Sequence, residues 1–202
     1  MLIAHLVPGY FAAVKSQPYW RPDWSPQRRT LLWVAAFSGT VIPDLDVIYN
    51  ALFRGFINHS TLWTHSLLVH LSIVLGWWVL KRIGRWPYLQ ALAGLVAIGG
   101  VSHLVLDMVS HGTPLLYPIS LELLGIPSQR VVEGGLKAYL TDPILLLEAL
   151  LLTLMAVHWT VSKSVNLWVR VLASALLLSG LVLFIATFIY LLPTLQTLVA
   201  GF

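Results

Sequence analysis

Long apolar runs separated by short polar segments organise almost the whole chain. A helix needs roughly 20 apolar residues to cross a bilayer core, so the longer runs predict transmembrane helices. Four runs qualify, at about residues 66–80, 88–110, 143–161 and 167–192. Two shorter runs precede them, at residues 2–14 and 30–43, and predict helices packed into the same bundle. We therefore expect an all-α, polytopic membrane helix bundle in which residues 1–202 form a single domain.

The composition favours a lipid environment. Hydrophobic residues make up 58% of the chain and charged residues 10%, which is far from the balance of a soluble domain. Most of the tryptophans flank the apolar runs, where an amphipathic indole ring sits at the level of the lipid headgroups. We expect an integral protein of the cytoplasmic (inner) membrane, with membrane lipid as its surroundings.

The basic residues predict the orientation in the membrane. The net charge of +4 arises in short loops rather than on one soluble face, which argues against a nucleic-acid partner. If the six segments alternate in direction, most basic residues fall on one side, which is then cytoplasmic. These are Lys15, Arg21, Arg28, Arg29, Lys81, Arg82, Arg85, Lys163 and Arg170. Residues 44–65 and 111–142 are then expected to be outside loops, and residues 112–140, broken by prolines and glycines, are expected to form a lid.

Histidines and aspartates gather at the predicted outer ends of the helices. This layer contains His5, Asp44, Asp46, His59, His65, His103 and Asp107. His103 and Asp107 are four residues apart, a spacing that places both on one helix face. Ionisable groups are costly near hydrocarbon unless they pair with each other or bind metal. The chain has no cysteine, so a metal must use nitrogen and oxygen ligands, which suit zinc, manganese or iron.

Each of these residues also has an ordinary structural explanation. Asp44 or Asp46 is explained about equally well as a helix N-cap, and His111 as a cation near a helix C-terminus. Asp142 and Glu148 follow the same layer along the chain, and with His111 they are further candidate ligands. The gathering of so many groups at one depth nevertheless favours a divalent metal site, with zinc preferred and two or more ions expected.

Four short motifs carry most of the candidate ligands. They are the N-terminal His5, Pro43-Asp44-Leu45-Asp46, Thr64-His65-Ser66 with His59 upstream, and Ser102-His103-Leu104-Val105-Leu106-Asp107. Together these motifs resemble the LexA-regulated, membrane-bound metal-dependent hydrolase family, over about residues 1–142. The resemblance implies that the seven residues of the outer layer are metal ligands and that the protein is a metal-dependent hydrolase.

A more distant resemblance concerns the order of the ligands. Carboxylate, histidine and then His-x-x-x-Asp is similar to the zinc-dependent phospholipase C and single-strand nuclease superfamily, whose helical enzymes bind three zinc ions and cleave phosphoesters. This implies phosphodiesterase-like or phospholipase-like activity. The chain departs from that superfamily because it has no His-x-x-x-Glu motif after residue 111.

The expected roles follow from metal-assisted hydrolysis. Of Asp44 and Asp46, one is expected to bridge the metal ions, and the other to orient a histidine or act as general base. Arg54 and Arg130 lie on the same predicted side and are expected to hold phosphate oxygens of the substrate. A catalytic layer at headgroup depth points to a phosphoester in a lipid or a lipid-linked substrate. The alternative is a metal-binding membrane protein for transport, sensing or structure, without hydrolase activity.

Overall fold

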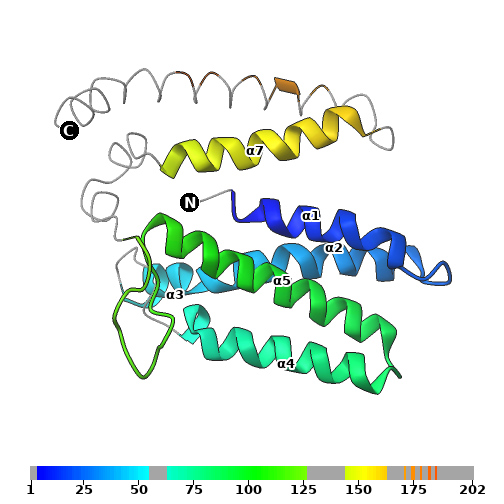
Figure 1. Ribbon diagram of the computed structural model, residues 1–202, viewed down its shortest axis with the longest axis horizontal. Coiled ribbons are helices and arrows are strands. Elements are labelled where there is room, and N and C mark those ends of the chain that lie inside the picture. The colour runs from blue at the N-terminus through cyan, green and yellow to red at the C-terminus, as the bar shows by residue number, and fades with distance from the viewer. Residues whose placement is uncertain are drawn as a thin grey trace, which may run out of the picture. The chain divides into compact units, whose positions relative to one another are not determined.

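The computed structural model describes residues 4–54, 63–126 and 144–162, together with positions 171, 174, 175, 178, 182 and 185. All named elements within these residues are helices, as the sequence predicted (Figure 1). The α-helices are α1 (Leu6–Ser16), α2 (Pro26–Val41), α3 (Leu45–Phe53), α4 (Leu67–Ile83), α5 (Pro87–Ser110) and α7 (Ile144–Val161). The 3₁₀ turns are η1 (Gln17–Tyr19), η2 (Ile42–Asp44) and η3 (Trp63–His65).

The helix α3 is the main departure from the predicted elements, because residues 44–65 were expected to form a loop. In α3 the polar Asp46 and Asn50 are fully buried, whereas the apolar Leu52 and Phe53 are exposed. This is the reverse of the pattern that marks a helix in water. The predicted segment 167–192 lies almost wholly outside the described residues.

The number of membrane-crossing helices also differs from the expected four. Within the described residues, α5 and α7 are long and apolar enough to cross a membrane. The helix α4 has 17 residues and carries Lys81 and Arg82 in its last turn. At about 1.5 Å per residue it extends roughly 25 Å, which is short of the ~30 Å hydrocarbon core. Its exposed face is nevertheless apolar, with Leu68, Leu71 and Leu75 in contact with the surroundings.

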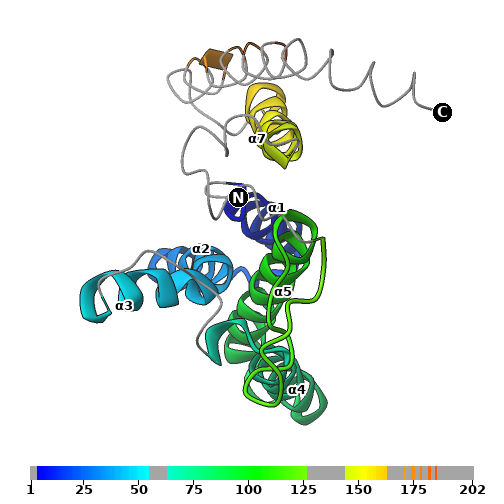
Figure 2. The same ribbon diagram turned by 90° about the vertical axis from the view of Figure 1, so that its left-hand side faces the viewer.

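The chain divides into two compact units. Residues 1–7 and 128–202 form one, and residues 8–127 form the other. The expectation of a single domain over residues 1–202 stays a prediction. Within the unit of residues 8–127, α5 packs against both α2 and α4 (Figure 2). The helix α1 contacts α2 at Gly9, where a Cβ atom would lie 2.7 Å from the carbonyl oxygen of Ala36. Its apolar core includes Ala13, Trp24, Leu32, Ala35, Ala36 and Leu95.

Two glycines allow α2 and α5 to approach until backbone meets backbone. A Cβ atom on Gly99 would lie 2.7 Å from the carbonyl carbon of Gly39, and one on Gly39 would lie 2.6 Å from the carbonyl oxygen of Val96. Such contacts between small residues are typical of helix pairs in membranes. The contact places the end of α2 beside His103, one turn beyond Gly99.

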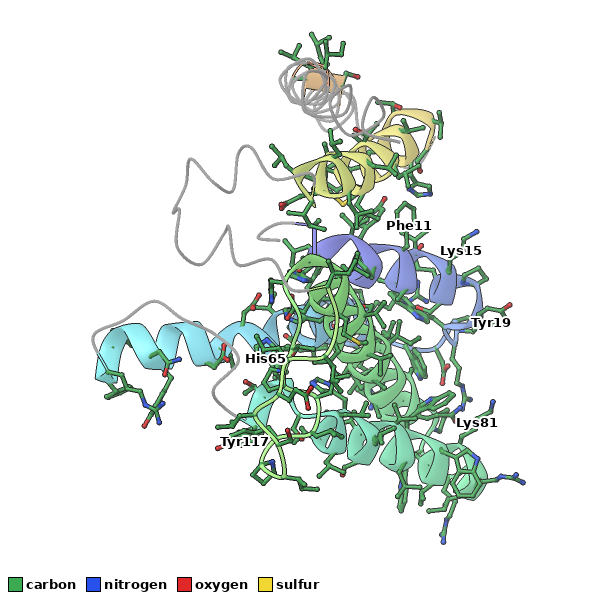
Figure 3. All side chains as sticks on the ribbon, turned by 60° about the vertical axis from the view of Figure 1, so that its left-hand side comes forward. Phe11, Lys15, Tyr19, His65, Lys81 and Tyr117 are labelled. Atoms are coloured by element: carbon green, nitrogen blue, oxygen red, sulfur yellow. The ribbon has the colours of Figure 1, made fainter. Side chains whose placement is uncertain are left out.

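The polar residues of this unit separate towards its two ends. Lys15, Tyr19 and Lys81 lie at one end, and His65 and Tyr117 lie at the other (Figure 3). The basic end also includes Arg28 and Arg29 at the start of α2 and Arg82 at the end of α4. Within this unit, the basic residues therefore lie at the end opposite to the histidine-containing end, and the predicted orientation depends on this separation.

We predict that Gly99→Ala destabilises the protein by about 1–3 kcal/mol, because the added methyl group would overlap the backbone of α2. The matched control is Gly76→Ala in α4, where an added Cβ meets nothing within 4 Å. Removing that glycine should leave stability unchanged or raise it slightly. Thermal unfolding of the purified proteins in detergent measures both effects, and equal midpoints for the two variants would contradict the close α2–α5 contact.

Candidate metal centre

Pro43 separates α2 from α3 and determines where two aspartates lie. Proline has no N–H to continue the helical hydrogen bonds, so α2 ends at Val41 and the chain turns through η2. Asp44 is the last residue of that turn, and Asp46 lies in the first turn of α3. The side chain of Asp46 is fully buried, and that of Asp44 is 31% exposed.

Hydrogen bonds from neighbouring residues hold the η3 turn that carries His65. Nε2 of His70, in α4, lies 2.9 Å from the carbonyl oxygen of Thr64. The hydroxyl of Ser66 donates to the carbonyl of Tyr117 at 2.6 Å, so the segment after α5 braces the same turn. His65 is fully buried as a result.

The end of α5 supplies His103, Asp107 and His111. Their spacing of four residues places them along one face of the helix, as the sequence predicted. Nδ1 of His103 lies 2.7 Å from the carbonyl oxygen of Thr40, and Nδ1 of His111 lies 2.7 Å from that of Gly112. A carbonyl oxygen can only accept, so each Nδ1 carries the hydrogen and donates it. Each ring therefore turns its Nε2 towards the carboxylates.

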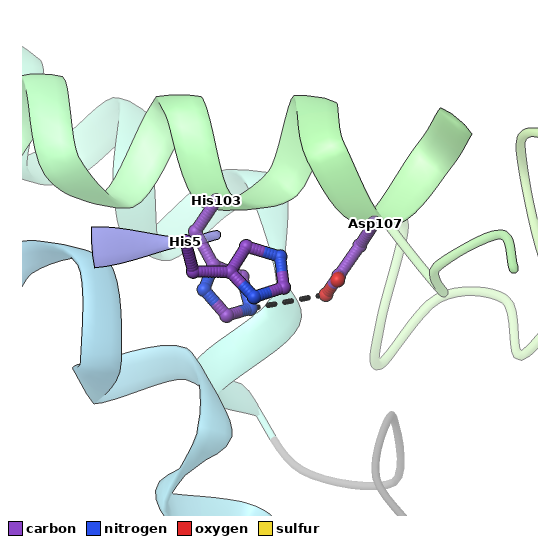
Figure 4. A group of neighbouring side chains, drawn as sticks. All are labelled: His5, His103 and Asp107. Atoms are coloured by element: carbon purple, nitrogen blue, oxygen red, sulfur yellow. Dashed lines mark ion pairs between the residues drawn. The ribbon is translucent and has the colours of Figure 1, made fainter. Parts of the chain in front are cut away.

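Asp107 lies at the centre of the cluster. Its Oδ2 atom is 3.0 Å from Nε2 of His103 and 3.2 Å from Nε2 of His65. Its Oδ1 atom is 3.2 Å from Nε2 of His111. Figure 4 shows His103 and Asp107 converging from successive turns of α5, with a dashed line for their ion pair. One carboxylate is thus shared by three imidazoles.

Asp46 and Asp44 add two further carboxylates. Oδ2 of Asp46 lies 3.0 Å from Nδ1 of His65, and Oδ1 of Asp44 lies 3.5 Å from Nε2 of His103. The two imidazole rings have their centroids 5.5 Å apart. Asp44 is the most exposed member of the cluster, so the surroundings reach the site on its side.

The donor set fits a divalent metal ion. One ligand atom each from Asp44, His65 and His103 lies within 4.8 Å of the others. Nitrogen and oxygen ligands of one zinc ion, at ~2.0–2.2 Å from it, are at most ~4.4 Å apart, so small side-chain shifts suffice. Carboxylates gathered in a buried place also require positive charge between them. The cluster can therefore hold a metal ion. Its ligand atoms are nitrogen and oxygen, so they suit any divalent ion that accepts both.

The predicted phosphate ligands do not join this cluster among the described residues. Arg54 ends α3 two turns beyond Asp46, and its guanidinium group lies 5.5 Å from the ring centroid of Tyr49. Arg130 lies outside the described residues, as do His59 and Asp142. Their predicted roles stay predictions.

His5 and Glu148 belong to the other unit of the chain. Both side chains are buried. Oε1 of Glu148 accepts a hydrogen bond from the backbone N–H of Ala4 at 3.2 Å, so α7 holds the segment that carries His5. This gives Glu148 a structural role, and the ligand role of His5 stays a prediction.

Asn50 is a buried polar residue near the cluster that the sequence reasoning missed. It lies one turn after Asp46 in α3 and is fully buried. The signal was the spacing of four between two polar residues in an otherwise apolar stretch, which puts them on one helix face. The expectation of a loop there concealed it. Its amide is therefore a second buried polar group on the helix face that carries Asp46.

Fold and cluster together define a helical membrane protein with a buried histidine–aspartate centre. A family profile described as YdjM inner membrane protein matches residues 1–191, and the chain belongs to this family. Comparisons with curated proteins and with solved structures give no significant match. The family confirms the inner-membrane location expected from the sequence. Its description names no reaction, so hydrolysis stays a prediction.

The contacts of His65 affect its protonation. Burial lowers the pKa of His65, but the hydrogen bonds to Asp107 and Asp46 outweigh burial and raise that pKa from 6.5 to about 9. In the absence of metal, His65 is therefore an imidazolium between two carboxylates at neutral pH. Because the folded-state pKa exceeds the unfolded value, this interaction stabilises the fold fully below pH 6.5, and the stabilisation is lost as the pH rises through 9.

We predict that the metal-free protein becomes less stable as the pH rises from about 6.5 to about 9, by on the order of 3 kcal/mol. Thermal unfolding in detergent with a chelator present measures this change. In His65→Gln the decline should flatten, because the amide does not titrate. A decline of the same size in the variant would show that another group is responsible.

Proposed function

We propose that the protein is a metal-dependent hydrolase that cleaves a phosphoester in a lipid or a lipid-linked substrate. The observation that carries this proposal is the carboxylate of Asp107 with three imidazoles around it, in a cluster accessible beside Asp44. The motifs that resemble the LexA-regulated hydrolase family support the reaction type. The inner-membrane family supports a substrate within the membrane.

His65, His103, Asp44 and Asp107 would hold the metal, with His111 on the far oxygen of Asp107. Zinc is the preferred ion, and manganese or iron would suit the same donors. When bound, such an ion lowers the pKa of a coordinated water and polarises a phosphoryl oxygen. His5 and His59 are the further ligands that the family resemblance implies, and two or more ions are part of the proposal.

The aspartates would divide the remaining tasks. Asp107 would take the bridging role expected of Asp44 or Asp46, because its carboxylate contacts three imidazoles. Asp46 holds Nδ1 of His65, which fixes the ring with Nε2 towards Asp107. Asp44 is partly exposed and lies at the accessible side, where its carboxylate can accept a proton from an attacking water.

The location of the cluster supports a lipid substrate. Basic residues gather at the opposite end of the unit, and short basic loops stay in the cytoplasm. On that rule the cluster faces the extracytoplasmic side, near the depth of the lipid headgroups. A phosphoester attached to a lipid would present its phosphate at this depth while its acyl chains remain in the bilayer.

A metal site without hydrolase activity is the second candidate. The full burial of Asp46, His65, His103 and Asp107 favours it, because structural metal sites are closed. Transport has less support. Residues 91–101 of α5 are all apolar or glycine, so this helix offers no ladder of ligands towards the basic end.

We predict that the purified protein loaded with zinc or manganese hydrolyses a phospholipid or a lipid-linked phosphate, and that Asp44→Asn lowers kcat at least ~100-fold. The metal content of this variant should change little, because the amide oxygen of asparagine can still ligate and His65, His103 and Asp107 remain. Phosphate or phosphomonoester release in mixed micelles measures activity, and atomic emission measures bound metal.

Glu122→Gln is the matched control, because it also replaces a carboxylate by an amide and Glu122 is exposed in the segment after α5. This variant should retain full activity. If the wild-type protein binds metal but releases no product from any lipid phosphoester, the hydrolase is excluded and the structural metal site is favoured. If Asp44→Asn unfolds in detergent with loss of metal, the same conclusion follows.

A further inference from the structure

The basic end of the unit of residues 8–127 contains a second pocket, far from the histidine–aspartate cluster. Its volume is about 600 Å³. Arg21 and Lys81 are its charged residues, Ser16, Tyr19 and Gln90 are further polar residues, and Trp20, Trp24 and Trp77 form much of its wall. These basic residues also underlie the predicted orientation, and the structure places two of them in the lining of a cavity.

The side chains of this pocket are held in position by neighbouring groups. Nε1 of Trp20 donates to the hydroxyl of Ser16 at 3.0 Å, and the buried ring of Trp24 packs edge-on against Tyr88. The ammonium group of Lys81 lies 5.4 Å from the ring centroid of Trp77. Aromatic rings with cations beside them are typical of protein surfaces at headgroup level.

An apolar groove adjoins this pocket and runs along α4 and α5. It has a volume of about 510 Å³ and is lined by Val74, Ala97, Val101, Val105 and Leu106, among others. Trp77, Gly94 and Ile98 line both cavities, so the two adjoin at these residues. Gly94 is needed there, because a Cβ atom on it would lie 2.8 Å from Nε1 of Trp77.

The charge around the pocket selects the sign of a ligand. Five further basic residues belong to the same segments of the chain as the two lining cations, namely Lys15, Arg28, Arg29, Arg82 and Arg85. Asp23 is the one acidic residue within residues 8–41 and 76–99. Asp23 contacts Nε of Arg21 at 3.2 Å, but both side chains are more than half exposed, and such pairs are weak. The guanidinium group has four further N–H donors for an anion.

The geometry points to a binding site for one anionic phospholipid, with its headgroup between Arg21 and Lys81 and an acyl chain in the groove of α4 and α5. A basic pocket beside an apolar groove matches the two chemical parts of such a lipid. Gln90 and His103 are 13 residues apart in α5, which is about 20 Å along the helix. The headgroup site is therefore separate from the proposed metal centre and does not depend on its chemistry.

Thermal unfolding of the full chain in detergent, with a chelator present, tests this site. Dioleoyl phosphatidylglycerol should raise the unfolding midpoint by about 5 °C more than dioleoyl phosphatidylcholine at the same concentration. The double variant Arg21→Gln/Lys81→Gln should lose this difference. The control Arg82→Gln/Arg85→Gln removes the same charge at the same end without changing the pocket lining, and it should keep the difference.

Three results would overturn the proposal. The two lipids could stabilise the wild-type protein equally, or the control could lose the difference as fully as the pocket variant. Inorganic phosphate could also reproduce the whole shift, which would make the pocket an anion site without a lipid.

A second variant tests the groove. Ile98→Trp should reduce the effect of phosphatidylglycerol on the unfolding midpoint while both cations remain, and an unchanged effect would exclude an acyl chain there.

Discussion

A buried carboxylate shared by three imidazoles is the interaction around which residues 8–127 are organised. Asp107 contacts His65, His103 and His111, and none of these contacts exceeds 3.2 Å. Leaving such a charge buried without partners would cost about 3–5 kcal/mol. The glycine contact of α2 and α5, the proline break before α3 and the bracing of η3 all serve to keep these partners in place.

The sequence could predict the parts of this arrangement that depend on local pattern. Apolar runs located α5 and α7, and the spacing of four located His103 and Asp107 on one face. It could not predict α3, because Asp46 and Asn50 face inward while apolar residues face outward. Nor could it predict that Asp107 lies at the centre of the cluster. That position depends on η3 and the end of α2 lying beside the last turns of α5. Hydropathy alone predicts that α4 crosses the membrane. It does not show that the helix is only 17 residues long and that its last turn carries Lys81 and Arg82.

The two ends of this unit suggest complementary contacts with the membrane. The histidine–aspartate end has buried ionisable groups that need a cation, and the basic end has exposed cations and aromatic rings that suit lipid phosphates. A lipid held at the basic end would fix the depth of α4 and α5 in the bilayer. That depth would in turn determine the distance between Asp44, at the accessible side of the cluster, and the headgroups of the opposite leaflet.

The location of bound metal tests the account most directly. Crystals of the protein grown with zinc, measured on either side of the zinc absorption edge, should give an anomalous peak ~2.0–2.2 Å from Nε2 of His103 and from a carboxylate oxygen of Asp107. A peak at this place establishes that the cluster is a metal centre. Ordered His65, His103 and Asp107 side chains in direct contact with each other, with zinc bound elsewhere or absent at saturating concentration, would contradict it.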